Sequence, residues 1–289
     1  MFYSPLRYPG GKGKLEPFME LLIEQTGHIG GTYIEPFAGG AGIALELLEK
    51  NIVNKIVIND LDKGVYSFWK AILTETDKFI NDIRNIPLTI DEWNRQRAVL
   101  EDNRRYSYEL GFATFYLNRT NRSGIIKGGV IGGVEQSGSW RMDARFNRNE
   151  LIERILKITR RKRQIHIYNK DVNSFVRNYL PQYEENAFVY FDPPYFGKGK
   201  QLYLNFFSYD DHVRIERMID DYVNCDWVIT YDDVQEIANI YQNHILRRFD
   251  LNYSAAVKRK ASEIIIFRRL DMMPNIKQLE ERGIFVNLR

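Results

Sequence analysis

Cysteine and long apolar runs are scarce in this sequence of 289 residues. The single cysteine, Cys225, excludes an internal disulfide and a thiolate metal cluster, and we expect no bound metal ion. No uninterrupted apolar run reaches ~18 residues, so a membrane-spanning helix is not expected. The N-terminal segment MFYSPLRYPGGKGK lacks the apolar core of a signal peptide. These absences predict a cytoplasmic protein with no membrane partner.

The charge of the chain is unevenly distributed, although its net value is only +3. Residues 90–165 carry 16 Lys and Arg against 9 Asp and Glu, whereas the rest of the chain carries 25 against 29. A basic segment inside an otherwise acidic chain is typical of a protein in which one part contacts a polyanion.

Strand and helix patterns alternate along most of the chain. Apolar strands are predicted at residues 32–36, 55–60, 164–168, 187–192 and 226–231, with helical patterns between them, and residues 246–253 and 262–269 add a hairpin at one edge. This alternation predicts an α/β fold with a doubly wound, mainly parallel, Rossmann-like sheet. We expect residues 1–72 and 164–289 to form one discontinuous domain. Residues 73–163 are predicted to be an inserted, largely helical and loop-rich domain.

A glycine-rich turn, EPFAGGAG at residues 35–42, follows the first predicted strand. Glycine lets the backbone turn tightly and approach a ligand closely. Asp60 ends the next strand, 21 residues after Gly39, where a carboxylate can hold ribose hydroxyls. Nicotinamide enzymes share these features, but the turn is not G-x-G-x-x-G and Glu35 would repel a pyrophosphate. Glu35 would attract a sulfonium with an α-amino group, so the pattern favours S-adenosylmethionine.

Residues 192–195, Asp-Pro-Pro-Tyr, end the apolar strand AFVYFD. Two consecutive prolines cannot continue a sheet, so Asp192 lies at the carboxyl edge of the strand, where open α/β sheets bind ligands. The Asp192 carboxylate and the Pro193 carbonyl can hold an exocyclic amine by two hydrogen bonds while its ring stacks on Tyr195. Two aligned acceptors favour the nucleophilic geometry of that amine. Asp192, Pro193, Pro194 and Tyr195 are therefore the predicted catalytic residues.

With these motifs in this order after the N-terminal segment RYPGGK (residues 7–12), the chain resembles the Dam-like DNA adenine methylases over nearly its whole length. The resemblance implies transfer of a methyl group from S-adenosylmethionine to the N6 amino group of adenine, with S-adenosylhomocysteine as product. The base must leave the duplex for its N6 to meet the donor. The implied cofactor site comprises Tyr8, Gly11, Lys12, Glu35, Phe37, Gly39, Gly40, Asp60, Asp171 and Val172. Within it, Asp171 is expected to reach the adenine of the cofactor. An alternative role for Asp171 is to cap the helix that follows it.

The resemblance places DNA recognition in the basic insertion. Residues 117–124, LNRTNRSG, resemble the Leu-Asn-Arg segment of the family, but the sequence after it is not that of the GATC-specific members, so no recognition site is inferred. Arginine suits guanine and asparagine suits adenine in the major groove, whereas Arg141 and Arg145 are better candidates for phosphate contacts. The predicted DNA-binding residues are Arg7, Asn118, Arg119, Asn121, Arg122, Arg141 and Arg145.

Other methylation reactions require different residues. Methylation at cytosine C5 needs a nucleophilic cysteine, usually after proline, and Cys225 lies in Asn-Cys-Asp. Methylation at cytosine N4 typically uses serine in place of Asp192, and RNA adenine methylases commonly lack this basic insertion. A regulator that binds S-adenosylmethionine without turnover is an alternative of another class. We expect double-stranded DNA as partner, a restriction endonuclease paired functionally with the protein, a monomer or weak dimer, and a bacterial or phage setting at the nucleoid.

Overall fold

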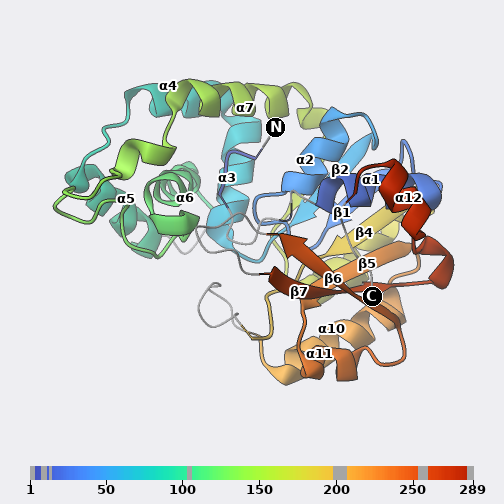
Figure 1. The fold of residues 1–289 in the computed structure, drawn as a ribbon. Helices are drawn as coiled ribbons and strands as arrows, with labels where there is room; N and C mark the ends of the chain where they lie inside the picture. Colours follow the sequence, from blue (N-terminus) through green and yellow to red (C-terminus); the bar gives the residue numbers. More distant parts are fainter. Residues whose placement is uncertain are drawn as a thin grey trace.

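The computed structural model describes residues 4–7, 12, 15–102, 106–197, 207–252 and 260–284, apart from the side chains of residues 250–252, 260 and 261. A seven-stranded sheet with helices on both faces forms its centre (Figure 1). Its order is β3-β2-β1-β4-β5-β7-β6, with β7 antiparallel to both of its neighbours and the other pairs parallel. The strands are β1 (Thr32–Glu35), β2 (Lys55–Asn59), β3 (Ile165–Tyr168), β4 (Ala187–Phe191), β5 (Asp226–Asp232), β6 (Ile245–Asn252) and β7 (Lys260–Phe267).

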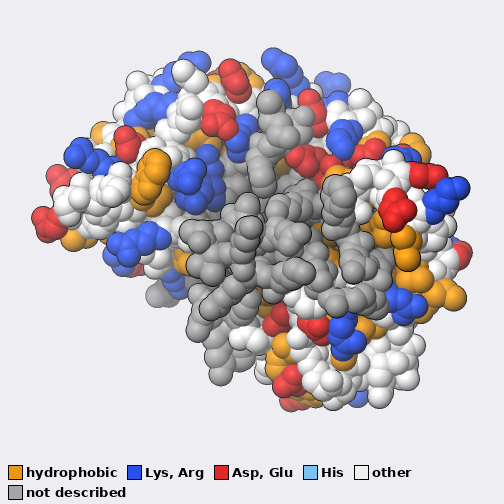
Figure 2. Space-filling model, viewed as in Figure 1, with side chains coloured by type: hydrophobic (Ala, Val, Ile, Leu, Met, Phe, Trp, Pro, Cys, Tyr) orange, Lys and Arg blue, Asp and Glu red, His pale blue; other side chains and the backbone are white. Residues whose placement is uncertain are grey.

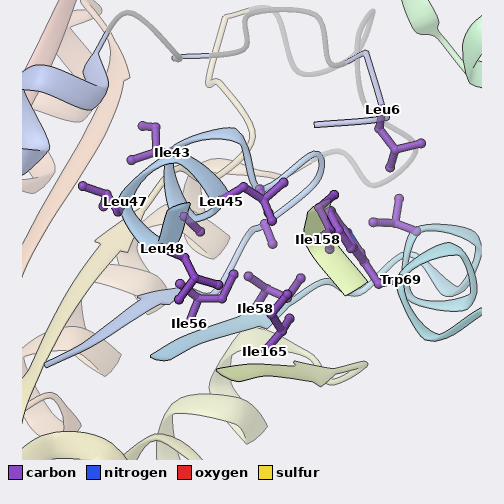
Figure 3. Packing of buried hydrophobic residues seen from close by; sticks show 14 of the residues in the cluster. Leu6, Ile43, Leu45, Leu47, Leu48, Ile56, Ile58, Trp69, Ile158 and Ile165 are labelled. Atoms are coloured by element: carbon purple, nitrogen blue, oxygen red, sulfur yellow. The ribbon is translucent and has the colours of Figure 1, made fainter. Parts of the chain in front are cut away.

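Alternating side chains of the strands build two apolar layers, because successive residues of a strand point to opposite faces. In β2, Ile56 and Ile58 belong to one layer and Val57 to the other. Figure 3 shows the first layer, in which Leu45 and Leu48 of helix α2 lie near these two isoleucines. The helices that accompany the sheet are α1 (Glu16–Gln25), α2 (Gly42–Glu49), α3 (Lys63–Thr74), α8 (Val172–Asn178), α10 (Tyr209–Tyr222), α11 (Gln235–Ile240) and α12 (Ile276–Glu281).

Helices α4 (Thr76–Asn85), α5 (Ile90–Asp102), α6 (Tyr108–Thr120) and α7 (Arg148–Arg160) form a helical part beside the sheet, at the left of Figure 1. Phe68 of α3 stacks on Phe115 of α6 with ring centroids 5.8 Å apart, and Phe79 of α4 meets Phe115 edge-on at 5.3 Å. Aromatic rings bury large apolar areas and favour such offset or edge-on pairs. One apolar cluster therefore continues from the sheet into the helical part. The limits of the inserted domain, residues 73 and 163, stay a prediction.

Several helices begin at a side chain that caps their first turn. Asp62 accepts from the N–H groups of Gly64 and Val65 at 2.7 and 3.0 Å, and Ser107 caps α6 in the same way. Such caps satisfy N–H groups that have no partner inside the helix.

The predicted fold class and the edge hairpin, β6–β7, are confirmed. Helices α1, α4, α5 and α12 were not predicted. No helix among the described residues is long and apolar enough to cross a membrane.

Candidate active site

A cavity of about 1090 Å³ lies where the carboxyl ends of β1, β2 and β4 face the helical part. The two sides of this cavity differ in charge. The sheet side carries mainly carboxylates, from Glu35, Asp60, Asp62, Asp171 and Asp192. The other side carries mainly cations, from Arg7, Arg119, Lys127, Arg145 and Arg154, with Asp143 and Glu150 among them. The cavity can therefore receive a cationic group at one side and an anionic group at the other.

The glycine-rich turn forms part of the sheet side, and side chains of β2's following loop and of α3 hold Gly39 in place. The Asp60 carboxylate accepts from the N–H of Gly39 at 2.8 Å, and the indole of Trp69 donates to the Gly39 carbonyl at 3.0 Å. Gly39 has φ of 47°, a conformation that glycine adopts without strain. Burial, together with the nearby Asp62 carboxylate, raises the pKa of Asp60 to about 7. Gly39 and Gly40 both line the cavity, and their contact with a cofactor stays a prediction.

Asn59, at the end of β2, joins the loops that follow three strands. Its amide donates at 3.0 Å to the carbonyls of Pro36 and Lys170, and its side-chain oxygen accepts from the Lys170 N–H at 3.0 Å. Asn59 also lines the cavity. Sequence reasoning did not single out this residue, although its place beside Asp60 at a strand end was a usable signal.

Glu35 ends β1 and is 5% exposed. Its carboxylate accepts from the Ala44 N–H in the first turn of α2 at 3.1 Å. Burial is the main reason that the pKa of Glu35 is raised to about 8, and the Asp192 charge acts in the same direction. A cation bound beside Glu35 would favour its ionised form.

Apolar side chains adjoin these carboxylates. Phe37 and Val172 line the cavity with Phe207, and the rings of Phe37 and Phe207 meet edge-on at 6.1 Å. Asp171 also lines the cavity, and its carboxylate accepts from the Ser174 N–H at 3.0 Å. The helix cap considered as an alternative role for Asp171 is thus present. Phe207 was not predicted, and the predicted cofactor residues Tyr8 and Gly11 lie outside the described residues.

Asp192 follows β4 and is bonded to groups from distant parts of the chain. Its Oδ1 atom lies 2.9 Å from Lys12 Nζ and accepts from the Thr230 hydroxyl at 3.2 Å. The side chain of Asp192 is 30% exposed, whereas that of Lys12 is only 1% exposed. Burial raises the pKa of Asp192 and Lys12 opposes this effect. Lys12 lines the cavity with its ammonium group engaged by Asp192, and its predicted contact with the cofactor stays a prediction.

The rest of the tetrapeptide is held against β5 and β7. The Tyr195 hydroxyl donates to Glu263 at 3.0 Å, and the Asp232 carboxylate accepts from the N–H groups of Phe196 and Gly197 at 2.9 and 2.8 Å. Pro194 lines the cavity together with Asp192, whereas Pro193 and Tyr195 do not. Stacking of a base on Tyr195 therefore stays a prediction. Thr230, Asp232 and Glu263 were not predicted from the sequence.

Arg119 is the most buried cation on the basic side of the cavity, at 7% exposed. Burial lowers its pKa to about 9, and the charges of Arg154 and Arg7 act in the same direction. Its buried Nε atom has no hydrogen-bond partner among the described residues. Figure 2 shows further Lys and Arg side chains over the helical part. Burial of the charged Arg119 guanidinium has a desolvation cost. An anion bound in this part of the cavity would offset that cost.

Asn118 and Asn121 hold the backbone together. Asn118 accepts from the Arg7 N–H at 2.7 Å and donates to the carbonyls of Arg7 and Gly124 at 2.8 Å. Asn121 accepts from the Trp93 indole at 2.7 Å and donates to two carbonyls of the loop after α6. Both asparagines are fully buried. The predicted DNA contacts of these two residues stay a prediction, and a base edge would have to displace these bonds to make them.

The remaining predicted DNA-binding residues divide into two groups. Arg7 and Arg145 line the cavity with Arg119. Arg122 and Arg141 are exposed and do not line it, and Arg122 donates to the Val130 carbonyl at 3.3 Å. Arg154, which lines the cavity from α7, was not predicted.

Residues 8–256 match the family of D12 class N6 adenine-specific DNA methyltransferases. The chain belongs to this family. Membership confirms the predicted methylation of adenine N6 in DNA in preference to the cytosine, RNA and non-catalytic alternatives. A methyltransferase of this family uses S-adenosylmethionine as methyl donor and DNA as substrate.

A curated relative supports the assignment. The Type II methyltransferase M.MjaIII of Methanocaldococcus jannaschii is 25% identical to this methyltransferase over 235 residues, which cover 73% of this chain and 77% of the relative.

Among solved structures, the rRNA methyltransferase aviRa from Streptomyces viridochromogenes has a TM-score of 0.39 at 12% identity, covering 96% of this chain and 90% of its own. Protein LPL1258 from Legionella pneumophila has a TM-score of 0.36 at the same identity and coverage. Similarity at this level carries no argument about the substrate of the methyltransferase.

Proposed function

We propose that methyl transfer takes place in this cavity, with the donor on the sheet side and the target adenine between Asp192 and the arginines. The observation that carries the proposal is that one cavity joins carboxylates at strand ends to a buried arginine of the helical part. A zwitterionic sulfonium and a nucleotide have complementary charges to these two sides.

The donor set on the sheet side fits S-adenosylmethionine. When bound, this cofactor supplies a methyl group already activated on a positively charged sulfur. Glu35 is buried and Asp60 is half-buried. Both carboxylates have raised pKa values and no ion pair to a cation of the chain among the described residues, so a cationic ligand would stabilise their charged forms. Asp60 would hold the ribose hydroxyls and Glu35 the amino acid end, with Phe37 and Val172 against the adenine ring. Asp171 would contact the cofactor adenine.

Asp192 would orient the nucleophile. Lys12 and Thr230 both contact Oδ1, which leaves Oδ2 to accept a hydrogen bond from the N6 amine. The Pro193 carbonyl would accept from the second amine hydrogen, and Tyr195 would contact the base. An acceptor pair placed in advance stabilises the charge that develops on nitrogen as the new N–C bond forms.

Arg119 would bind a phosphate of the DNA backbone near the extruded base. A buried guanidinium with an unpartnered Nε suits a phosphate oxygen, and Arg7, Arg145 and Arg154 would add charge around it. This assignment replaces the reading of a guanine by Arg119. Arg122 and Arg141 would contact the DNA outside the cavity.

The biological setting is proposed from the relative. M.MjaIII is named a Type II methyltransferase. We therefore propose a cognate endonuclease as functional partner. Sequencing of DNA from cells that express the methyltransferase, scored for N6-methyladenine context, would give the site that such an endonuclease must share.

Asp192→Ala tests the catalytic assignment. Loss of an aligned charged acceptor commonly costs two to three orders of magnitude in rate, or roughly 3–4 kcal/mol. We expect methyl transfer from labelled S-adenosylmethionine to fall by that factor while the dissociation constant of the cofactor changes less than about twofold. Turnover at the wild-type rate by a folded variant would show that Asp192 does not orient the amine.

A further inference from the structure

Glu263, near the start of β7, is linked to both ends of the catalytic tetrapeptide. One carboxylate oxygen accepts from the Tyr195 hydroxyl at 3.0 Å, and the other lies 3.0 Å from Lys12 Nζ. Lys12 in turn lies 2.9 Å from Asp192. Glu263 therefore touches Tyr195 directly and reaches Asp192 through a single ammonium group.

The topology of the sheet brings Glu263 to this place. β7 runs antiparallel to β5, with Glu263 opposite Asp232 and Ile265 opposite Thr230. The beginning of an antiparallel strand thus lies at the edge where the parallel strands end. Glu263 is 2% exposed and does not line the cavity, so it has no direct route to the substrates.

The buried charges of Glu263 and Lys12 are not accounted for by the stability of the fold alone. Placing charges in the interior is costly, and a buried ion pair is commonly no more stabilising than apolar residues of the same shape. Here one buried cation, Lys12, is shared between two carboxylates. Of these two carboxylates, Asp192 is the one that lines the cavity, where a cationic donor and a developing positive charge on nitrogen would meet its charge.

We propose that Glu263 is a positioning residue for methyl transfer, which fixes Lys12 against Oδ1 of Asp192 and holds the Tyr195 hydroxyl. The inference rests on the proposed roles of Asp192 and Tyr195. With Lys12 held between two carboxylates, the Asp192 side chain keeps one orientation, and its second oxygen points to the place of the amine. The same carboxylate fixes the direction of the Tyr195 ring.

The charge of Glu263 has a second consequence. Burial lowers the pKa of Lys12, but the two carboxylates outweigh this effect and raise it, so Lys12 stays charged. The negative charge of Glu263 also raises the pKa of Asp192. Removal of that charge should lower the pKa of Asp192 and move the acid limb of the rate profile to lower pH.

The test is Glu263→Gln, which keeps the shape of the side chain and removes its charge. Methyl transfer would be measured in single turnovers at saturating S-adenosylmethionine and DNA between pH 5.5 and 9. We expect the rate to fall about 10- to 100-fold, with both dissociation constants within about twofold of wild type and the acid limb moved to lower pH. Glu263→Asp keeps the charge, so its acid limb should stay where it is in the wild type.

Two controls separate positioning from loss of structure. Glu216→Gln removes a carboxylate on α10 that contacts His244, remote from the cavity, and should behave as wild type in every measurement. Tyr195→Phe removes only the hydroxyl from which Glu263 accepts a hydrogen bond, and it keeps the proposal testable if Glu263→Gln does not fold. Tyr195→Phe should slow methyl transfer several-fold. In the double variant with Glu263→Gln, the two effects on the activation free energy should not be fully additive, because the two residues are in contact.

A wild-type rate in Glu263→Gln, or a slower rate with an unmoved acid limb, would overturn the proposal. A wild-type rate in Tyr195→Phe would overturn its Tyr195 half. Asp192→Ala distinguishes these failures from failure of the proposed catalytic role. If Asp192→Ala retains activity, that role fails; if it is inactive while Glu263→Gln is normal, only the inference about Glu263 fails.

Discussion

Replacement of Glu35 by glutamine should stabilise the cofactor-free protein at alkaline pH and weaken its affinity for S-adenosylmethionine. Glu35 is 5% exposed with a pKa of about 8, against 4.5 for an unburied glutamate. Between these two values the folded state holds a proton that the unfolded state has released, so stability falls as the pH rises. The stabilising contribution is fully present below pH 4.5 and is lost as the pH rises through about 8.

The size of the effect follows from the two pKa values. Between pH 5.5 and 8.5, a group with these values removes about 3 kcal/mol from the free energy of unfolding. For a chain of this length, that corresponds to a shift of about 5 °C in melting temperature. Glutamine does not titrate, so Glu35→Gln should gain about 5 °C over wild type on going from pH 5.5 to 8.5. It retains an oxygen that can accept from the Ala44 N–H, as Glu35 does.

Cofactor affinity should change in the opposite direction. A hydrogen bond to a charged group contributes about 1.5–3 kcal/mol, so the dissociation constant should rise about 10- to 100-fold at pH 8.5. Wild-type affinity should itself increase as the pH rises through about 8, because the cation binds the ionised carboxylate. Thermal melts at both pH values and calorimetry with S-adenosylmethionine would measure the two effects. Glu92→Gln, equally buried at 5% but remote from the cavity, should leave cofactor affinity unchanged. The same melting difference at both pH values would refute the reasoning.

Three further substitutions test the assignments in the cavity. Asp60→Asn should raise the dissociation constant of S-adenosylmethionine about 10-fold or more, because the amide nitrogen donates where the ribose hydroxyls and the Gly39 N–H need an acceptor. If calorimetry shows an unchanged affinity, the role of Asp60 is restricted to holding the glycine-rich turn. Arg119→Met should weaken binding to cognate and scrambled duplexes alike, and should make the dependence of log affinity on log salt concentration shallower by about one unit. Weaker binding to the cognate duplex alone would instead assign Arg119 to base recognition. Asn118→Ala should lower the free energy of unfolding by about 1–3 kcal/mol, because it leaves buried groups of Arg7 and Gly124 unpaired; a specificity change without loss of stability would contradict this role.

Local sequence rules were enough for the strands and for the acidic side of the cavity. Glu35, Asp60 and Asp192 each end or follow an apolar strand, and the carboxyl ends of parallel strands meet at one edge of the sheet. The glycine-rich turn and the two prolines mark where the strands stop, because their backbone preferences act within a few residues. The sequence by itself therefore determined the fold class and the place of Glu35, Asp60 and Asp192 at one edge of the sheet, whereas Asp62, which also lines the cavity, was not predicted.

Only the tertiary structure decided which partners those carboxylates have. Glu263 reaches the tetrapeptide through the antiparallel register of β5 and β7, and Lys12 reaches Asp192 across 180 residues of chain. Asn118 and Asn121 follow one another closely in a motif that suits DNA bases, yet the packing of α6 turns both inward. The sequence pattern indicates which chemistry a side chain can perform. Which face of a helix is buried, and which distant strand lies beside it, depends on the packing of the whole chain.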